Sequence, residues 1–238
     1  MPIAIDSLNR SNSRLIEIDR RVRDVQIDVW SRRNELWSGS PPQNLIDIFE
    51  PSVALADRGY AVKSVGSLGD TYVNGVKGEV AGVISRNPRM VSISQRFTLP
   101  IQRFTLAHEL GHDVCHPGEN GLHRDVPVEK TGQFRNWKEV EADRFASSFL
   151  MPERLVVRQF GECFRVECVE LSEEMAYALC GVGEEHVRQQ HKSLRGIAQL
   201  VAGAGQFNGR QFLPLASQFR VSRIAMAIRL EELGLVRF

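Results

Sequence analysis

The residues whose types and spacing most clearly suggest a catalytic site are His108, Glu109 and His112, which form an H-E-x-x-H motif. On an α-helix, residues four apart lie on the same face, so His108 and His112 can hold one metal ion together. Neutral imidazole nitrogens suit zinc, and two of them leave room for a third protein ligand and a water molecule. Glu109 leans toward the same space and can take a proton from that water. The motif therefore predicts a zinc site that hydrolyses a bond.

The residues around the motif predict a buried helix. Leu106, Ala107 and Leu110 are apolar, and a buried helix seldom carries two histidines and a glutamate unless they are paired or bind a metal. Gly111 costs up to about 1 kcal/mol relative to alanine inside a helix. We therefore expect another element to pack closely against Gly111. The alternative is a helix that merely carries two histidines.

The third metal ligand is the first open question. The metzincin pattern continues H-E-x-x-H with a glycine and a third histidine, but here no glycine stands at the required place. His116 follows His112 by one helical turn and stays on the helix. We expect His116 to support a ligand or to pack, and its direct binding to the metal is the less favoured alternative. Pro117 and Gly118 are expected to end the helix.

A second helix over residues 136–150 offers carboxylates. Its buried face is marked by apolar residues at helical spacing, namely Ala142, Phe145, Ala146 and Phe149. Glu139 borders this face, so we prefer it as the third ligand. Asp143, one turn later, can accept the N–H of a zinc-bound histidine. Glu141 points elsewhere and is expected to be a solvated charge, with metal binding as its alternative role.

The two motifs together resemble the ImmA/IrrE family of zinc metallopeptidases. The resemblance covers residues 78–153 and rests on R-F-T-L-A-H-E-L-G-H, then E-x-E-A-D-x-F-A, then L-M-P. It implies a gluzincin-like site in which His108, His112 and Glu139 bind Zn²⁺ and Glu109 is the general base. It also implies a cytoplasmic protease of bacterial or phage type that cleaves a helix-turn-helix repressor. Asp143 stands where asparagine is common in the family, and residues 161–209 match no pattern that we identify.

Composition excludes several other classes of protein. The chain has 238 residues, of which 42% are hydrophobic and 25% charged, as in ordinary globular proteins. A net charge of +1 argues against a protein that coats nucleic acid, and no apolar run approaches the roughly 18 residues of a membrane span. The first residues show no basic-then-apolar pattern, so we expect no signal peptide, and the four cysteines form no C-x-x-C pair. We expect a cytoplasmic protein with no membrane partner.

The pattern of elements predicts an α+β fold. We expect a zincin-like metallopeptidase core of helices on a small three-stranded sheet over residues 1–160, followed by a helical region over 161–238. The expected helices cover residues 13–37 and 44–58, a site helix that begins between 100 and 103, residues 136–150, and a further helix after Pro152. The expected strands cover residues 60–65, 78–84 and 90–94, the last two as a β-hairpin.

The hairpin and its surroundings suggest how a substrate is held. A sheet edge beside a zinc helix can pair with an extended peptide, although a covered or purely structural edge is the alternative. The polar loop over residues 118–135 could cover the cleft. The candidates for stabilising the oxyanion are Arg103, His116, His123 and Tyr72, and none has a spacing that favours it.

Residues 214–235 have the pattern of a helix-turn-helix, in which Ser222 caps the second helix. Arg220, Arg223 and Arg229 favour direct DNA contact, but Arg220 stands where the turn usually has glycine. We therefore prefer a unit that packs or docks on protein. Residues 119–185 hold 14 acidic and 8 basic residues, whereas 186–238 hold 2 and 8. This basic stretch is expected to dock on its acidic neighbour or to face an acidic partner.

These features predict a zinc-dependent endopeptidase that cleaves a cytoplasmic protein. The preferred substrate is a helix-turn-helix transcriptional repressor, cleaved in a stress response or in a mobile-element or toxin-antitoxin response. The alternative is a non-catalytic regulator that binds DNA or protein and keeps only a structural zinc. An open coordination position favours the enzyme, because structural zinc sites use four protein ligands.

Overall fold

The computed structural model describes all residues except 1–2, 74–75, 119–122 and 126–135. The chain forms two compact units, Met1–Leu150 and Met151–Phe238. The expected boundary after residue 160 falls inside helix α7 (Glu153–Phe164). Both units contain helices and short strands, so the expected α+β class with a helical C-terminal region is confirmed. None of the described helices is long and apolar enough to cross a bilayer.

The N-terminal helices are more divided than the sequence predicts. Two helices stand where one was expected over residues 13–37. Two also stand where one was expected over residues 44–58. The four are α1 (Ile3–Ser31), α2 (Arg33–Leu36), α3 (Leu45–Ile48) and α4 (Pro51–Asp57). Pro51 occupies the first position of α4, where its missing N–H costs nothing, and this separates α4 from α3. Gly59 follows α4 with a φ of +82°, a conformation that glycine adopts without strain.

The main sheet has four strands in the order β1-β5-β4-β6. Its strands are β1 (Ala61–Val65), β4 (Gly82–Arg86), β5 (Arg89–Ser94) and β6 (His123–Asp125). The hairpin of β4 and β5 is confirmed, and β1 pairs with β5 in parallel. The expected three-stranded sheet gains β6, which comes from the segment expected to be a loop. Because β6 pairs with residues 82–84, this stretch of the β4 edge is covered.

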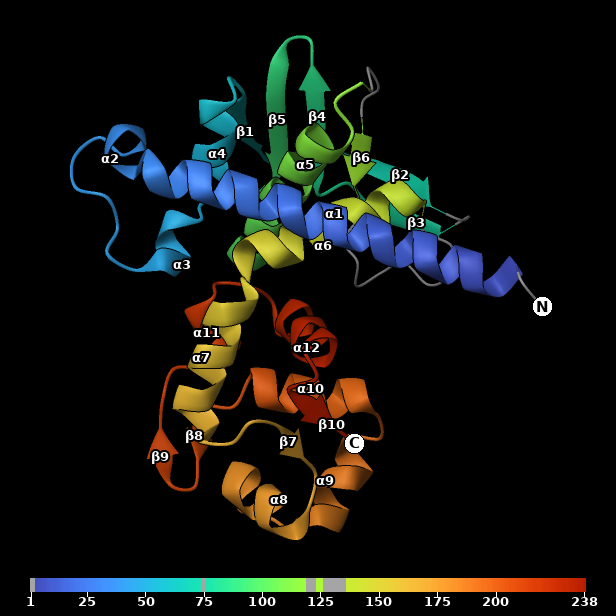
Figure 1. Cartoon of the computed structure of the whole chain (residues 1–238), viewed down its shortest axis with the longest axis vertical. Coiled ribbons are helices and arrows are strands. Elements are labelled where there is room, and N and C mark those ends of the chain that lie inside the picture. The colour runs from blue at the N-terminus through green and yellow to red at the C-terminus, as the bar shows by residue number, and fades with distance from the viewer. Residues whose placement is uncertain (1–2, 74–75, 119–122, 126–135) are drawn as a thin grey trace. The chain divides into compact units, whose positions relative to one another are not determined.

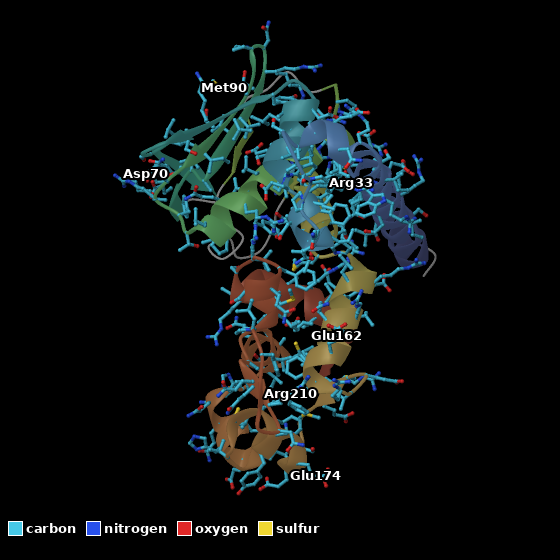
Figure 2. The ribbon with its side chains drawn as sticks, turned by 90° about the vertical axis from the view of Figure 1, so that its left-hand side faces the viewer. Arg33, Asp70, Met90, Glu162, Glu174 and Arg210 are labelled. Atoms are coloured by element: carbon cyan, nitrogen blue, oxygen red, sulfur yellow. The ribbon has the colours of Figure 1, made fainter. Side chains whose placement is uncertain are left out.

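A second β-ribbon was not expected. It consists of β2 (Asp70–Val73) and β3 (Val76–Glu79), which pair antiparallel. Gly78 and Glu79, expected to open the main hairpin, belong to this ribbon instead. Figure 2 labels Asp70 on the β2–β3 ribbon and Met90 on the β4–β5 hairpin, both in the first unit.

Two helices carry the predicted functional residues. Helix α5 (Leu99–Cys115) packs on β4 and β5 on one side and against α6 (Trp137–Leu150) on the other, while α1 lies along α6 (Figure 1). Pro100 lies in the first turn of α5, and the helix ends before Pro117, as expected. His116, however, does not stay on the helix: it is the C-cap residue, with a φ of −126° and a ψ of 55°. The apolar side chains of the core between these layers include Ile84, Ile93, Leu110, Phe145 and Phe149. The sheet and α6 thus hold α5 from both sides.

The second unit begins with α7 and has its own core, which includes Phe160, Phe164, Phe219, Met226 and Leu230. Its other elements are β7 (Val169–Glu170), α8 (Glu173–Cys180), α9 (Glu184–Gln190), α10 (Leu194–Ala202), β8 (Gln206–Phe207), β9 (Arg210–Gln211), α11 (Leu215–Gln218), α12 (Arg223–Glu232) and β10 (Val236–Arg237). Strand β10 pairs in parallel with β7. Arg210, labelled with Glu162 in Figure 2, donates hydrogen bonds to the carbonyls of Glu162 and Cys163.

Helices α11 and α12 form the expected helix–turn–helix arrangement. The Oγ of Ser222 accepts a hydrogen bond from the backbone N of Ala225 at 3.1 Å, which confirms the predicted cap. Arg220 has a φ of +53°, the left-handed conformation for which the turn usually uses glycine.

One arginine of this arrangement is not available to DNA. Arg229 is only 3% exposed, and it donates to the carbonyl of Met151 at 3.0 Å and to Glu232 at 3.0 Å. The expectation that Arg229 contributes to a DNA-binding face is therefore wrong. The error arose because a helical repeat does not reveal that a neighbouring loop carbonyl can bind a buried guanidinium.

Candidate metal centre

The two histidines of the motif lie side by side on α5. Their side chains are 0% and 1% exposed, and Nε2 of His108 lies 3.0 Å from Nε2 of His112. The four-residue spacing thus directs both Nε2 atoms to one point, as predicted.

Gly111 explains how α6 comes close enough to complete the site. A Cβ at Gly111 would lie 3.1 Å from both the Cα and the carbonyl oxygen of Ala142. The expected close packing against Gly111 is therefore present, and α6 is the element that supplies it. This approach sets Glu139, one turn before Ala142, across from the histidines.

The Glu139 carboxylate completes a group of three converging atoms. Its Oε2 lies 3.2 Å from Nε2 of His108 and 3.5 Å from Nε2 of His112. Among the described residues, these three side chains are the group whose ligand atoms lie close enough together to share a metal ion. Glu141, the alternative ligand, does not belong to this group.

A second carboxylate on α6 orients His108. Oδ1 of Asp143 lies 2.9 Å from Nδ1 of His108. When this carboxylate accepts the Nδ1–H, the lone pair of His108 is on Nε2 and faces Glu139. This is the usual support for a metal-binding histidine.

The donor set fits a zinc ion. Two imidazole lone pairs and a carboxylate oxygen converge at separations of 3.0 to 3.5 Å. Three acceptors this close repel one another unless a cation lies between them. Ligands at zinc–nitrogen distances of 2.0–2.1 Å in tetrahedral geometry stand about 3.3–3.4 Å apart. Two histidines with one glutamate also leave a fourth position open, as catalytic zinc sites do.

The ionisation of Glu139 suits this role. Burial alone would raise the pKa of Glu139. When His108 and His112 are protonated on Nε2, their hydrogen bonds and charges outweigh burial and hold this pKa well below its usual range. Glu139 is therefore a carboxylate at neutral pH, the form that binds a cation.

Glu109 lies on the sheet side of α5, beside the three converging side chains of His108, His112 and Glu139. It is 0% exposed, and a Cβ at Gly82 of β4 would lie 3.0 Å from its Oε1 and would overlap Cγ2 of Thr105. Only glycine therefore lets β4 run this close to Glu109. The role of Gly82 is not among the predictions from the sequence, although a glycine inside an alternating strand signals a close approach.

Residues 70–162 match the IrrE N-terminal-like domain. This family model, Peptidase_M78, spans β2 through most of α7 and contains every residue of the metal group. The match confirms the resemblance to the ImmA/IrrE family for this part of the chain and supports a peptidase. No curated protein matches the chain.

Within the matched residues, His116 lies beside His112, as expected. Nδ1 of His116 is 3.3 Å from Nδ1 of His112, and its Nε2 is 2.9 Å from Oε2 of Glu141. The side chain of Glu141 is only 14% exposed. The expectation of a solvated Glu141 is therefore wrong, because His116 at the end of α5 reaches the flank of α6 on which Glu141 lies.

Two of the four oxyanion candidates, Arg103 and His116, are hydrogen-bonded to other protein groups. Arg103 is buried and binds Glu50 and the carbonyls of Ile46 and Phe49, so it anchors α5 to α3 and α4. These bonds give Arg103, one of the candidates, a structural role. His116 is hydrogen-bonded to Glu141, Tyr72 is exposed on the β2–β3 ribbon, and the side chain of His123 lies outside the described residues.

Proposed function

We propose that the chain is a zinc-dependent endopeptidase. His108, His112 and Glu139 bind the zinc ion, and Glu109 is the general base. The observation that carries this proposal is the convergence of two imidazole nitrogens and one carboxylate oxygen, all within 3.5 Å, beside a buried glutamate. The rival function, a non-catalytic regulator with a structural zinc, gives Glu109 no role.

The chemistry divides between the metal and the side chains. When bound, zinc acts as a Lewis acid on the scissile carbonyl and lowers the pKa of water. Glu109 accepts a proton from the attacking water and delivers it to the leaving amine. Asp143 keeps the proton of His108 on Nδ1, so that the Nε2 lone pair stays directed at the ion.

The proposed substrate is a helix-turn-helix transcriptional repressor in the cytoplasm, cleaved during a stress or mobile-element response. The resemblance to the ImmA/IrrE family supports this substrate. The second unit is proposed to help recognise the repressor rather than to bind DNA itself, because Arg229 is committed to Met151 and Glu232.

The test of this function is a cleavage assay with the full chain loaded with zinc. The substrate is a helix-turn-helix repressor encoded beside it, and the matched control is Glu109→Gln. We expect a single cut in the repressor that the control lacks. Cleavage that persists in Glu109→Gln contradicts the mechanism, and cleavage of unrelated proteins with the repressor left intact contradicts the regulatory role.

The test of recognition by the second unit uses point substitutions in place of a truncation. Truncation at residue 210 would remove Phe219, Met226 and Leu230 from the core of that unit. Reversing the exposed charges Lys192→Glu and Arg237→Glu preserves that core. We expect slower cleavage of the repressor and unchanged cleavage of a short generic peptide. If both variants cleave the repressor as fast as the unsubstituted chain does, the recognition role is contradicted.

A further inference from the structure

The two metal-binding histidines are supported differently. Nδ1 of His108 contacts the carboxylate of Asp143 directly, at 2.9 Å. Nδ1 of His112 contacts another imidazole, that of His116, at 3.3 Å, and the far nitrogen of His116 contacts Glu141 at 2.9 Å. A chain of two hydrogen bonds thus replaces the direct carboxylate on this side of the site.

The contacts select one arrangement of protons. Glu141 is an acceptor as a carboxylate, so Nε2 of His116 must donate to it. A neutral His116 then has its lone pair on Nδ1, where it can accept the Nδ1–H of His112. This leaves the Nε2 lone pair of His112 directed toward Glu139 and His108. The opposite tautomer of His116 would place its N–H against that of His112 and leave Glu141 without this donor.

His116 is held rigidly enough for this purpose. Its side chain is 4% exposed, and Trp137 packs against its ring edge-to-face, with the centroids 5.6 Å apart. Arg86 of β4 donates to the carbonyls of both His112 and His116 at 3.0 Å, which fixes the last turn of α5. Three elements, β4, α5 and α6, therefore determine where this imidazole lies.

We propose that His116 and Glu141 are a positioning pair that fixes the tautomer and ring orientation of His112 through this chain. The inference rests on the proposed zinc site and extends it to two residues that do not touch the metal. Partners of this kind commonly change metal affinity by about 10–100-fold.

The experiment measures zinc affinity by competition with a chelator, together with the visible absorption of the cobalt-loaded protein, which reports ligand geometry. Glu141→Leu removes the acceptor, whereas Glu141→Gln keeps an oxygen that can accept from His116. We expect Glu141→Leu to weaken zinc binding by about 10–100-fold and to alter the cobalt spectrum. Glu141→Gln should remain close to the unsubstituted protein, and this variant keeps the test valid if Glu141→Leu folds poorly.

Two controls separate positioning from general support of α6. Asp19→Leu breaks the 2.8 Å ion pair with Arg144, which ties α6 to α1 without touching an imidazole. It should leave zinc affinity and the cobalt spectrum unchanged. The double variant His116→Ala with Glu141→Leu should bind zinc no more weakly than His116→Ala alone, because both residues act through one chain.

Three outcomes would overturn the proposal: unchanged zinc affinity in a folded Glu141→Leu, additive losses in the double variant, or an equal loss in Asp19→Leu. None of these readouts depends on peptide cleavage. A protein that binds zinc as described but cleaves nothing would contradict the proposed function and leave this inference standing.

Discussion

Oδ1 of Asp143 lies 2.9 Å from Nδ1 of His108, and Asp143 follows Glu139 by four residues on α6. One face of α6 therefore carries both a proposed metal ligand and the partner of another proposed ligand. The same spacing of four places His108 and His112 on α5. The site is the meeting of two helical faces, and each face is set by the pitch of the helix.

This relationship gives the first prediction. Asp143→Leu removes the acceptor for the Nδ1–H of His108 and should weaken zinc binding by about 10–100-fold. Asp143→Asn keeps an amide oxygen that can accept the same proton, so it should retain most of the affinity. Chelator competition measures both variants. Equal losses in the two would show that the charge of Asp143, and not its acceptor oxygen, supports His108.

The second prediction concerns the third ligand. Glu139→Ala removes an atom of the metal group, whereas Glu141→Ala removes only the outer partner of His116. Zinc retained after dialysis should therefore be much lower for Glu139→Ala. The reverse order would mean that Glu141 binds the metal and that the assignment of the two carboxylates is incorrect.

The sequence predicts the contacts of this site that depend on spacing within one helix, and it does not predict those between distant segments. The sequence predicts that His108, His112, Glu139 and Asp143 share one site because helical spacing is a local property. The contact between Glu141 and His116 was missed because it joins the flank of α6 to the residue just beyond α5. No periodicity within either helix reveals such a contact.

The fold shows the same division. Helices α5 and α6 and the Ser222 cap follow from local patterns and were predicted. Strand β6 has three residues, and its pairing with β4 joins segments about forty residues apart, so no alternation marked it. The β2–β3 ribbon was missed for a related reason, because its four-residue strands are too short for a clear pattern.

A third prediction tests the close packing of α5 on α6. Gly111→Ala gains up to about 1 kcal/mol of helix propensity, but its Cβ would press on the backbone of Ala142 at 3.1 Å. Overpacking of this kind costs about 1–3 kcal/mol. We expect a lower thermal midpoint and weaker zinc binding, since Glu139 would move away from the histidines.

Gly161 of α7 provides the matched control for this test. A Cβ there would meet no atom within 4 Å, so Gly161→Ala should stabilise the protein by about 0.5–1 kcal/mol and leave zinc binding unchanged. Thermal unfolding of both variants measures the difference. Equal stabilisation by the two substitutions would show that α6 yields readily and that Gly111 does not set the geometry.

A fourth prediction concerns the strand beside Glu109. Gly82→Ala would place a Cβ against Cγ2 of Thr105 and 3.0 Å from Oε1 of Glu109. We expect peptide cleavage to fall while zinc stays bound, because the base is displaced and the metal ligands are not. Adding Thr105→Ser removes the methyl group and should restore part of the activity. Loss of zinc in Gly82→Ala would indicate that the strand supports the whole helix.

The most direct test of the central claim measures both the zinc content and the cleavage rate of the Glu109→Gln variant. Glu109 is not among the converging ligand atoms, so the variant should keep one zinc ion per chain. Loss of a general base commonly costs about 10²–10⁴-fold in rate, and the cleavage rate should fall by that factor. Full cleavage by a folded, zinc-loaded Glu109→Gln protein would contradict this account of the site.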